Sequence, residues 1–157
     1  MRRLILSLLL ISIVGCPREK KKEPEKISAY GLTLTKNSPP KEVAGLLIKG
    51  LDNEDESLLV RLVAIKYEMR EVEEILKSFS KRLTPERVAS LTASGWLLTY
   101  SFFLPGKTRI EEERIEGDSA YVYARGEKRD GRMKTLEVKM VREDGWWKVT
   151  AGLKEED

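Results

Sequence analysis

Four stretches in which apolar and polar residues alternate constrain the second half of the chain most strongly. Short turns that contain glycine separate these stretches, which cover residues 108–116, 119–128, 133–142 and 146–153. A period of two is that of a half-buried β-strand, and a short turn joins antiparallel neighbours. The pattern therefore predicts an antiparallel four-stranded meander. The first strand has Ile110 and Ile115 as its only apolar residues, so we expect it at an edge.

Alternation also predicts which side chains face the core. The inward residues of the second and third strands are small, aliphatic or Met: Ala120, Val122, Ala124, Leu136, Val138 and Met140. Tyr121 and Tyr123 then lie on the opposite face. In the fourth strand, Trp147 shares the parity of Val149, so we expect it in the core. Trp146 is expected on the outer face, where it covers a helix edge or a loop, or anchors an interface.

Helical patterns occupy the first half of the domain. A short segment, 27–35, comes first and is either a strand or an extended lead-in. Ser38 and the two prolines after it form a helix start, in which the serine caps and the prolines lose no hydrogen bond. The sequence therefore predicts a helix over 39–49 that Gly50 ends.

The most regular pattern has apolar residues alternately four and three positions apart: Leu58, Leu62, Ile65, Met69, Val72, Leu76, Phe79 and Leu83. This is a heptad seam, which Leu59, Val63 and Ile75 widen. It fits one helix, or two with a kink near 68–71, packed on a core; the alternative is a dimeric coiled coil. Four carboxylates are expected on a solvated face that pairs with Arg70 and Lys77: Glu68, Glu71, Glu73 and Glu74.

Thr84 and Pro85 begin another helix, with Val88 and Leu91 inward and its end near Ser94–Gly95. Residues 96–104 read as a strand or a last helical turn, and the Pro-Gly pair that follows is expected to break it. Helices followed by a meander predict an α+β fold, with N-terminal helices packed on a curved C-terminal antiparallel sheet.

The first sixteen residues have the layout of an export signal. Two arginines precede an apolar run, Leu4–Val14, that is too short to span a bilayer of about 30 Å as a helix. Gly15 and Cys16 follow, and Ile13-Val14-Gly15-Cys16 resembles the lipobox of bacterial lipoproteins. The resemblance implies cleavage between Gly15 and Cys16, acylation of Cys16 by fatty chains of the palmitate type, and a protein held at the cell envelope.

Two alternatives for this segment stay open: an ordinary secretory signal with a chance cysteine, and a buried cytosolic cysteine. If Cys16 carries lipid, the mature domain has no thiol and no disulfide. Pro17 stands where aspartate marks inner-membrane retention in some Gram-negative lineages, so the outer membrane is favoured if there is one.

Residues 17–26 contain no apolar side chain, so we expect a disordered tether whose lysines can add contacts with anionic headgroups. The chain is thereby divided into a signal peptide over 1–15, a lipidated cysteine with its tether over 16–26, and a single domain over 27–157.

The net charge of the domain argues against nucleic acid as a partner. The chain has 29 basic and 26 acidic residues, of which two basic residues lie in the signal, and five basic and three acidic residues lie in the tether. From Ile27 onward 22 basic residues face 23 acidic ones, whereas a nucleic-acid-binding domain is expected to carry a basic excess.

The strand region also resembles a known fold. The stretches RIEEERIEGDSAYVYARGE and TLEVKMVREDGWWKVT, in which GDSAYV and EDGWWKV carry the likeness, resemble the cone of nuclear transport factor two-like proteins. The ketosteroid isomerases and the cystatin-like fold class are related to it. The resemblance covers roughly residues 108–150 and implies helices wrapped on a curved sheet that often leaves a pocket.

Three functions compete. The first is a lipid-anchored, non-enzymatic binding or interaction domain with an envelope protein as partner. The second is a small-molecule carrier or sensor that uses a cone pocket, lined by aromatic residues at Trp96, Phe102 and Trp147. The third is an enzyme, which we do not expect, because the chain has no histidine to serve as a base near neutral pH. No cofactor and no metal site are expected, since the acidic residues show no convergent ligand pattern.

Overall fold

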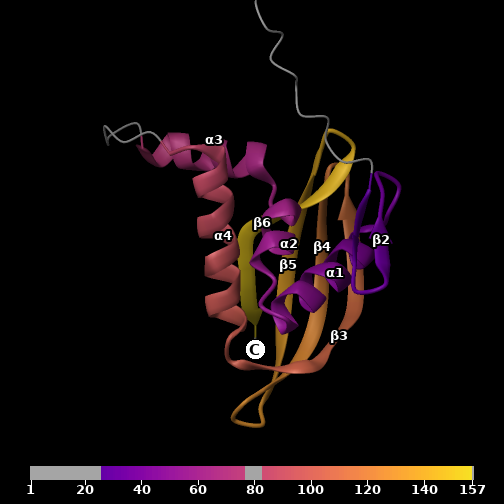
Figure 1. The fold of residues 1–157 in the computed structure, drawn as a ribbon. Coiled ribbons are helices and arrows are strands. Elements are labelled where there is room, and N and C mark those ends of the chain that lie inside the picture. Colours follow the sequence, from indigo (N-terminus) through magenta and orange to yellow (C-terminus); the bar gives the residue numbers. More distant parts are fainter. Residues whose placement is uncertain (1–25, 77–82, 157) are drawn as a thin grey trace, which may run out of the picture.

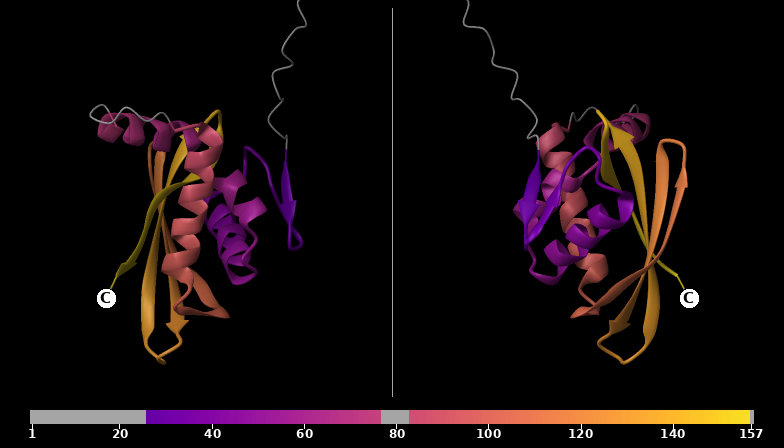
Figure 2. Two further views of the ribbon diagram at one scale, coloured as in Figure 1. Left: turned by 60° about the vertical axis from the view of Figure 1, so that its left-hand side comes forward. Right: turned by 90° about the vertical axis from the view of Figure 1, so that its right-hand side faces the viewer.

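A computed structural model describes residues 26–76 and 83–156, which form three layers (Figure 2). A four-stranded sheet is covered on one face by helices, and a small two-stranded hairpin lies beyond the helices. The predicted α+β class is confirmed: among the described residues, four helices precede the main sheet (Figure 1).

The main sheet is the predicted meander. It consists of β3 (Phe103–Glu116), β4 (Ser119–Lys128), β5 (Met133–Glu143) and β6 (Trp146–Glu156), in the order β3-β4-β5-β6 and antiparallel throughout. The edge position of β3 is confirmed. All six side chains that alternation placed inward in β4 and β5 are buried, and they join a single hydrophobic core.

Two irregularities shape the sheet. The prediction that Pro105 and Gly106 end the preceding segment is wrong. Both residues lie inside β3, where the register shifts between Phe103 and Thr108. In β6, a second shift lies between the pairs Val138–Leu153 and Met140–Val149, so extra residues of β6 bulge out of the ladder.

The first segment forms a hairpin rather than a single strand. β1 (Ile27–Ala29) pairs with β2 (Leu32–Leu34), and the two residues between them, Tyr30 and Gly31, have φ angles of 51° and 75°. Two central residues with positive φ are those of a tight type I′ turn. Ile27 and Leu34 are buried, so the hairpin closes the core on the far side of the helices.

The first helix, α1 (Pro40–Asp52), runs past the predicted stop at Gly50. A Cβ atom added at Gly50 would lie 2.9 Å from Leu59 Cδ2, so the glycine serves close packing of α1 on the next helix. Ser38 is not the cap: Pro39 takes that position, and Ser38 Oγ instead accepts from the N–H of Thr35.

The heptad region contains two helices, α2 (Glu56–Leu62) and α3 (Ile65–Leu76), but the break is at 63–64 and not near 68–71. Val63 pairs with Val149 at the outer edge of β6, and the N–H of Ala64 donates to Val149 O at 2.8 Å. The break therefore follows from a tertiary contact. Of the predicted seam, Phe79 lies outside the described residues.

The last helix, α4 (Pro85–Tyr100), begins as predicted, with Thr84 Oγ1 accepting from the N–H of Arg87. Its predicted end near Ser94–Gly95 is wrong, because the helix continues to Tyr100. Leu91 faces solvent rather than the core. The buried side of α4 consists of other residues: Val88, Ala89, Ala93, Trp96 and Tyr100.

Candidate functional site

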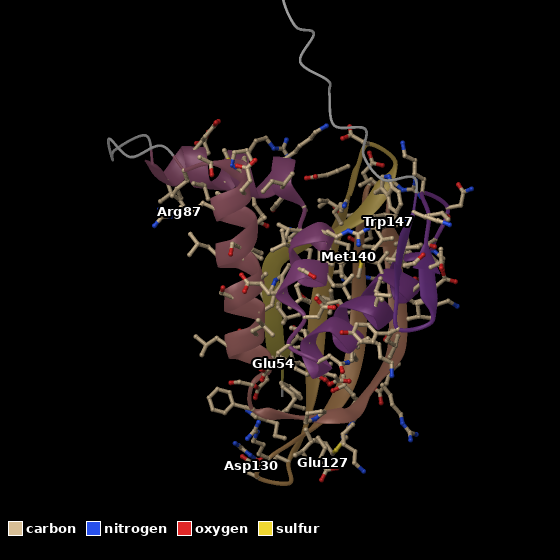
Figure 3. All side chains as sticks on the ribbon, viewed as in Figure 1. Glu54, Arg87, Glu127, Asp130, Met140 and Trp147 are labelled. Carbon is tan, nitrogen blue, oxygen red and sulfur yellow. The ribbon has the colours of Figure 1, made fainter. Side chains whose placement is uncertain are left out.

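The space between the helices and the sheet is filled by side chains. Trp96 is 1% exposed, and its indole N–H donates to Thr150 O at 3.2 Å. The rings of Tyr100 and Phe103 stack with their centres 5.2 Å apart. Figure 3 shows Met140, which is fully buried, in the body of the molecule. These residues hold the helices on the sheet, and Trp96 is part of that core.

The other aromatic residues predicted to line a pocket or an interface do not converge. Trp147 is buried as expected, with the Arg142 guanidinium carbon 4.7 Å from its ring centre. Trp146 has the predicted outward parity, opposite Glu143 in the ladder, but it is 3% exposed, so it is covered within the domain. Phe102 is exposed at the far end of α4. Gly15 and Cys16 lie outside the described residues.

Trp146 is buried because α3 begins against its face of the sheet. Glu143 lies opposite Trp146 in the ladder, so the two side chains share that face. Glu143 Oε1 accepts from the N–H of Tyr67 at 2.7 Å, and Oε2 accepts from the N–H of Lys66 at 3.3 Å. The Lys148 ammonium lies 5.7 Å from the indole centre of Trp146 and donates to Arg61 O.

A groove with a volume of about 840 Å³ lies beside this contact, between α3 and the ends of the two hairpins β3–β4 and β5–β6. The Glu143 carboxylate caps α3, where free N–H groups and the helix dipole favour an anion. The Lys66 ammonium donates to Asp144 at 2.7 Å, which holds the pKa of the Asp144 carboxyl below its usual value. One turn of the sheet thus fixes the start of α3.

Tyr67 forms the wall of the groove nearest the outer face of the sheet. Its ring centre lies 5.4 Å from the Lys139 ammonium and 5.7 Å from the Arg70 guanidinium carbon. Lys139 also donates to the Tyr67 hydroxyl at 3.4 Å, which raises the pKa of the lysine. Both cations are therefore within the distance at which they attract an aromatic ring.

Glu68 is buried, which corrects the expectation that it lies on a solvated face. Its Oε1 accepts from the N–H of Ala151 at 2.7 Å, in the bulged part of β6. Burial raises the pKa of the Glu68 carboxyl, and the nearby Glu71 and Glu143 act in the same direction. The carboxylate supplies the hydrogen bond that the bulge takes from the ladder. Glu71, Glu73 and Glu74 are exposed, as predicted.

The groove is suited to binding. Its lining combines apolar side chains with both signs of charge: Ile65, Met69, Pro85 and Val141 with Arg70, Arg142, Glu73 and Asp118. The chain has no histidine, and its one cysteine is Cys16, so the lining of the groove contains neither a histidine base nor a cysteine nucleophile. Within residues 26–76 and 83–156, no three His, Cys, Asp or Glu side chains are grouped to hold a metal ion.

A polar contact at the other end of the helices is structural. The Tyr100 hydroxyl donates to Asp52 Oδ1 at 2.8 Å and lies 2.8 Å from Thr108 Oγ1. Burial raises the pKa of Tyr100, and the hydrogen bond to Asp52 adds to the effect, so the phenol stays protonated. The contact ties the ends of α1 and α4 to β3. Shallow hollows of about 300 and 440 Å³ flank Asp52.

Sequence reasoning missed Glu143, Tyr67 and Glu68 as functional neighbours. Glu143 was assigned only to a turn, and it is 76 residues from the N–H of Tyr67 that it caps. The acidic turn ahead of the two tryptophans is the one local signal, because it places a carboxylate at the end of a hairpin. No pattern in the sequence indicates which helix it would cap.

Comparison with known proteins gives one distant likeness. The structure is similar to that of a protein from Campylobacter jejuni named an NTF2-like transpeptidase, with a TM-score of 0.45 and 18% identity, over 72% of this chain and 98% of that chain. No family model and no curated protein match the sequence. No conclusion about activity follows from a likeness this distant. Among the described residues, no helix is both long and apolar enough to cross a membrane.

Proposed function

We propose that the chain is a lipid-anchored protein of the bacterial cell envelope whose α+β domain is a non-enzymatic interaction module. The anchor rests on the sequence: Gly15 and Cys16 follow an apolar run of signal-peptide length, and a tether without apolar residues follows Cys16. Two or three fatty chains hold a protein stably on a membrane, whereas one chain does so only marginally.

The observation that carries the interaction function is the groove of about 840 Å³ beside α3. It lies on the surface of a domain whose interior is packed, and Glu143 fixes its helical wall through two backbone N–H groups. A carrier or sensor would need the interior space that Trp96, Phe103 and Met140 fill, so the structure offers no support for that alternative.

The partner that fits the groove is a segment of another envelope protein. The lining carries three basic side chains and four carboxylates together with apolar side chains, so a ligand of one strong charge sign meets repulsion as well as attraction. A peptide presents both apolar side chains and charges of either sign. The domain's net charge near zero agrees with such a partner better than with a polyanion.

The anchor is tested by intact mass. The full chain is expressed in a bacterial host, with and without globomycin, beside a Cys16→Ser variant. We expect a mature mass that starts at Cys16 and includes acyl chains. The variant should lose both the cleavage and the added mass, whereas the peptidase inhibitor should block the cleavage and leave the lipid on the Cys16 thiol of the uncleaved chain. A mature protein without lipid contradicts the anchor.

The groove is tested by photo-crosslinking in cells. A benzoylphenylalanine is placed at Met69 or at Asp118, both in the groove, and at the exposed Tyr30 on the opposite hairpin as the control. A discrete adduct of the same mass from both groove positions, and none from Tyr30, supports the proposal. Absence of an adduct from both groove positions, or the same adduct from Tyr30, contradicts it.

A further inference from the structure

The outer face of α4 is apolar although it faces solvent. Leu91 is 56% exposed and Leu98 is 70% exposed, and both lie on the side opposite the buried Trp96. Phe102, 57% exposed, follows directly after the helix. No charged residue occurs between Arg87 and Lys107, in a chain that is 35% charged. Figure 2 shows α4 on the surface of the molecule, with no described element over its outer face.

A glycine in the middle of this face has no role in the packing of the domain. Gly95 lies inside α4, and a Cβ atom added there would meet nothing within 4 Å. Glycine weakens a helix interior relative to alanine, so it needs a reason. Gly50 has one, because a Cβ there would crowd Leu59. The monomer gives no such reason for Gly95, whereas a second helix crossing closely at this point does.

The residues of this face are arranged symmetrically. The midpoint between Leu91 and Leu98 falls between Ser94 and Gly95, and so does the midpoint between Arg87 and Phe102. A twofold axis through that midpoint places Leu91 of one copy against Leu98 of the other, with the small residues at the crossing. Self-complementarity of this kind is what a twofold interface requires.

The charges at the two ends of the helix agree with an antiparallel pair. Glu86 lies in the first turn of α4, whereas Lys107 and Arg129 lie beyond its last turn, and the N–H of Arg129 donates to Phe102 O. Antiparallel pairing brings Glu86 of one copy toward the basic end of the other. It also brings Arg87, which points away from the body in Figure 3, toward Phe102 of the partner copy. The Lys128 ammonium already lies 5.5 Å from the centre of that ring, so the attraction between the two ends comes from Glu86.

We infer that the outer face of α4 docks on the same face of a second copy of this chain, as an antiparallel helix pair. A helix of 16 residues is about 24 Å long and about 10 Å wide, so the two faces together bury roughly 500 Å². Stable interfaces bury about 1,200 Å² or more, so this pair is weak and forms when copies are concentrated. The inference stands apart from the groove and from the lipid anchor.

A membrane surface is the competing occupant. Helices that lie on a membrane carry Lys and Arg along the border of their apolar face, and α4 has no such residue after Arg87. Close packing at Gly95 is likewise of no use against lipid. These two features favour a second copy.

Cysteine crosslinking of the full chain tests the pairing. Two differently tagged copies, one with Leu91→Cys and one with Leu98→Cys, are expressed together and oxidised in intact cells. Each variant alone and the chain without an engineered cysteine are the controls. Both positions are exposed, so neither change removes core packing. In an antiparallel pair, position 91 meets position 98, whereas two copies of position 91 lie about 10 Å apart along the helix, too far for a disulfide.

We expect the mixed pair to form a disulfide-linked dimer in at least about fivefold higher yield than either variant alone. If either variant alone forms the dimer in a yield equal to that of the mixed pair, the helices pair in parallel and the inference is overturned. The absence of a crosslinked dimer from the mixed pair would also overturn it. A dimer in the control without an engineered cysteine would show a free Cys16 thiol, which bears on the anchor alone; the mixed pair is then compared after subtraction of that background.

Discussion

The two faces of α4 have similar apolar side chains and different roles. Trp96 and Leu98 are two residues apart, yet the first is 1% exposed and the second is 70% exposed. Trp96 is held by the core and by a hydrogen bond to the fourth strand, whereas Leu98 is in solvent. An apolar residue on a helix can therefore serve either the fold or an interaction, and only its burial separates the two.

The same contrast separates two glycines, each inside a helix. Gly50 lets α1 approach α2, so packing within the domain explains why a glycine occupies this position. Gly95 lies in open space on α4 and is a cost to the monomer. Gly50 therefore serves packing within the domain, whereas Gly95 leaves room for a close contact at the surface of α4.

The largest expected effect sharpens the contrast between the faces of α4. Trp96→Ala removes a core indole and should lower the free energy of unfolding by roughly 3–5 kcal/mol. Leu98→Ala, its matched control, should change it by less than about 0.5 kcal/mol. Urea unfolding measures both. Similar losses in the two variants would break the contrast.

The second effect concerns the glycines. Gly50→Ala should destabilise the domain by roughly 1–3 kcal/mol, because a Cβ 2.9 Å from Leu59 Cδ2 requires either the fully buried Leu59 side chain or the helices to shift. Gly95→Ala should stabilise the monomer by about 0.5–1 kcal/mol through helix propensity. Unfolding midpoints at low protein concentration check the two signs, and a stabilised Gly50→Ala would contradict the packing argument.

The third prediction concerns the stability of the first turn of α3 relative to α4, because the Glu143 side chain of the sheet caps α3. Glu143→Ala should cost about 0.5–2 kcal/mol through loss of this cap. Hydrogen exchange should quicken in the first turn of α3 and remain unchanged in α4. Asp144→Asn removes the charge of the exposed pair with Lys66 and keeps a residue that tolerates the positive φ of 50° at this position. It should cost less than about 1 kcal/mol and serves as the control.

The smallest effect is a dependence on pH. Because burial raises the folded-state pKa of Glu68 above its ordinary value of 4.5, the folded state binds this proton more tightly than the unfolded state. Glu68 therefore lowers stability progressively as pH rises from 4.5 through the raised pKa. Glu68→Gln should remove this loss, so its free energy of unfolding relative to that of the wild type should increase toward neutral pH.

Urea unfolding of the wild type and Glu68→Gln across this pH range checks the sign. Shifts of Asp144 and other carboxyls are common to both proteins and cancel in the difference. Glu73→Gln, an exposed change in the same helix, should show no comparable trend. A difference between wild type and Glu68→Gln that does not vary with pH would contradict the account.

The sheet could be predicted well because alternation is local. Each inward residue of β4 and β5 follows from its neighbours, as Val122 and Val138 illustrate. The helix ends could not be predicted, because Gly50 and Gly95 resemble stops in sequence and are held inside helices by helix packing and continued hydrogen bonding. The break at Val63 likewise depends on its pairing with Val149, 86 residues away.

Fewer features of the candidate site than of the sheet could be predicted from the sequence. The Cys16 anchor depends on contiguous residues and stays a prediction. Strand parity placed Trp146 on the outer face, and a run of carboxylates placed Glu68 on a solvated face, because both signals are local. Their burial comes from the docking of α3 on β6, which brings together segments more than 70 residues apart.

The most direct test of the role of the outer face of α4 is the self-association constant of Gly95→Ala against that of the wild type, measured by sedimentation equilibrium of the full chain in detergent. The added methyl group lies at the helix crossing, so we expect association weaker by about tenfold, or ~1.4 kcal/mol, in a protein whose fold is more stable. Unchanged or tighter association would contradict the assignment of this face to a second copy.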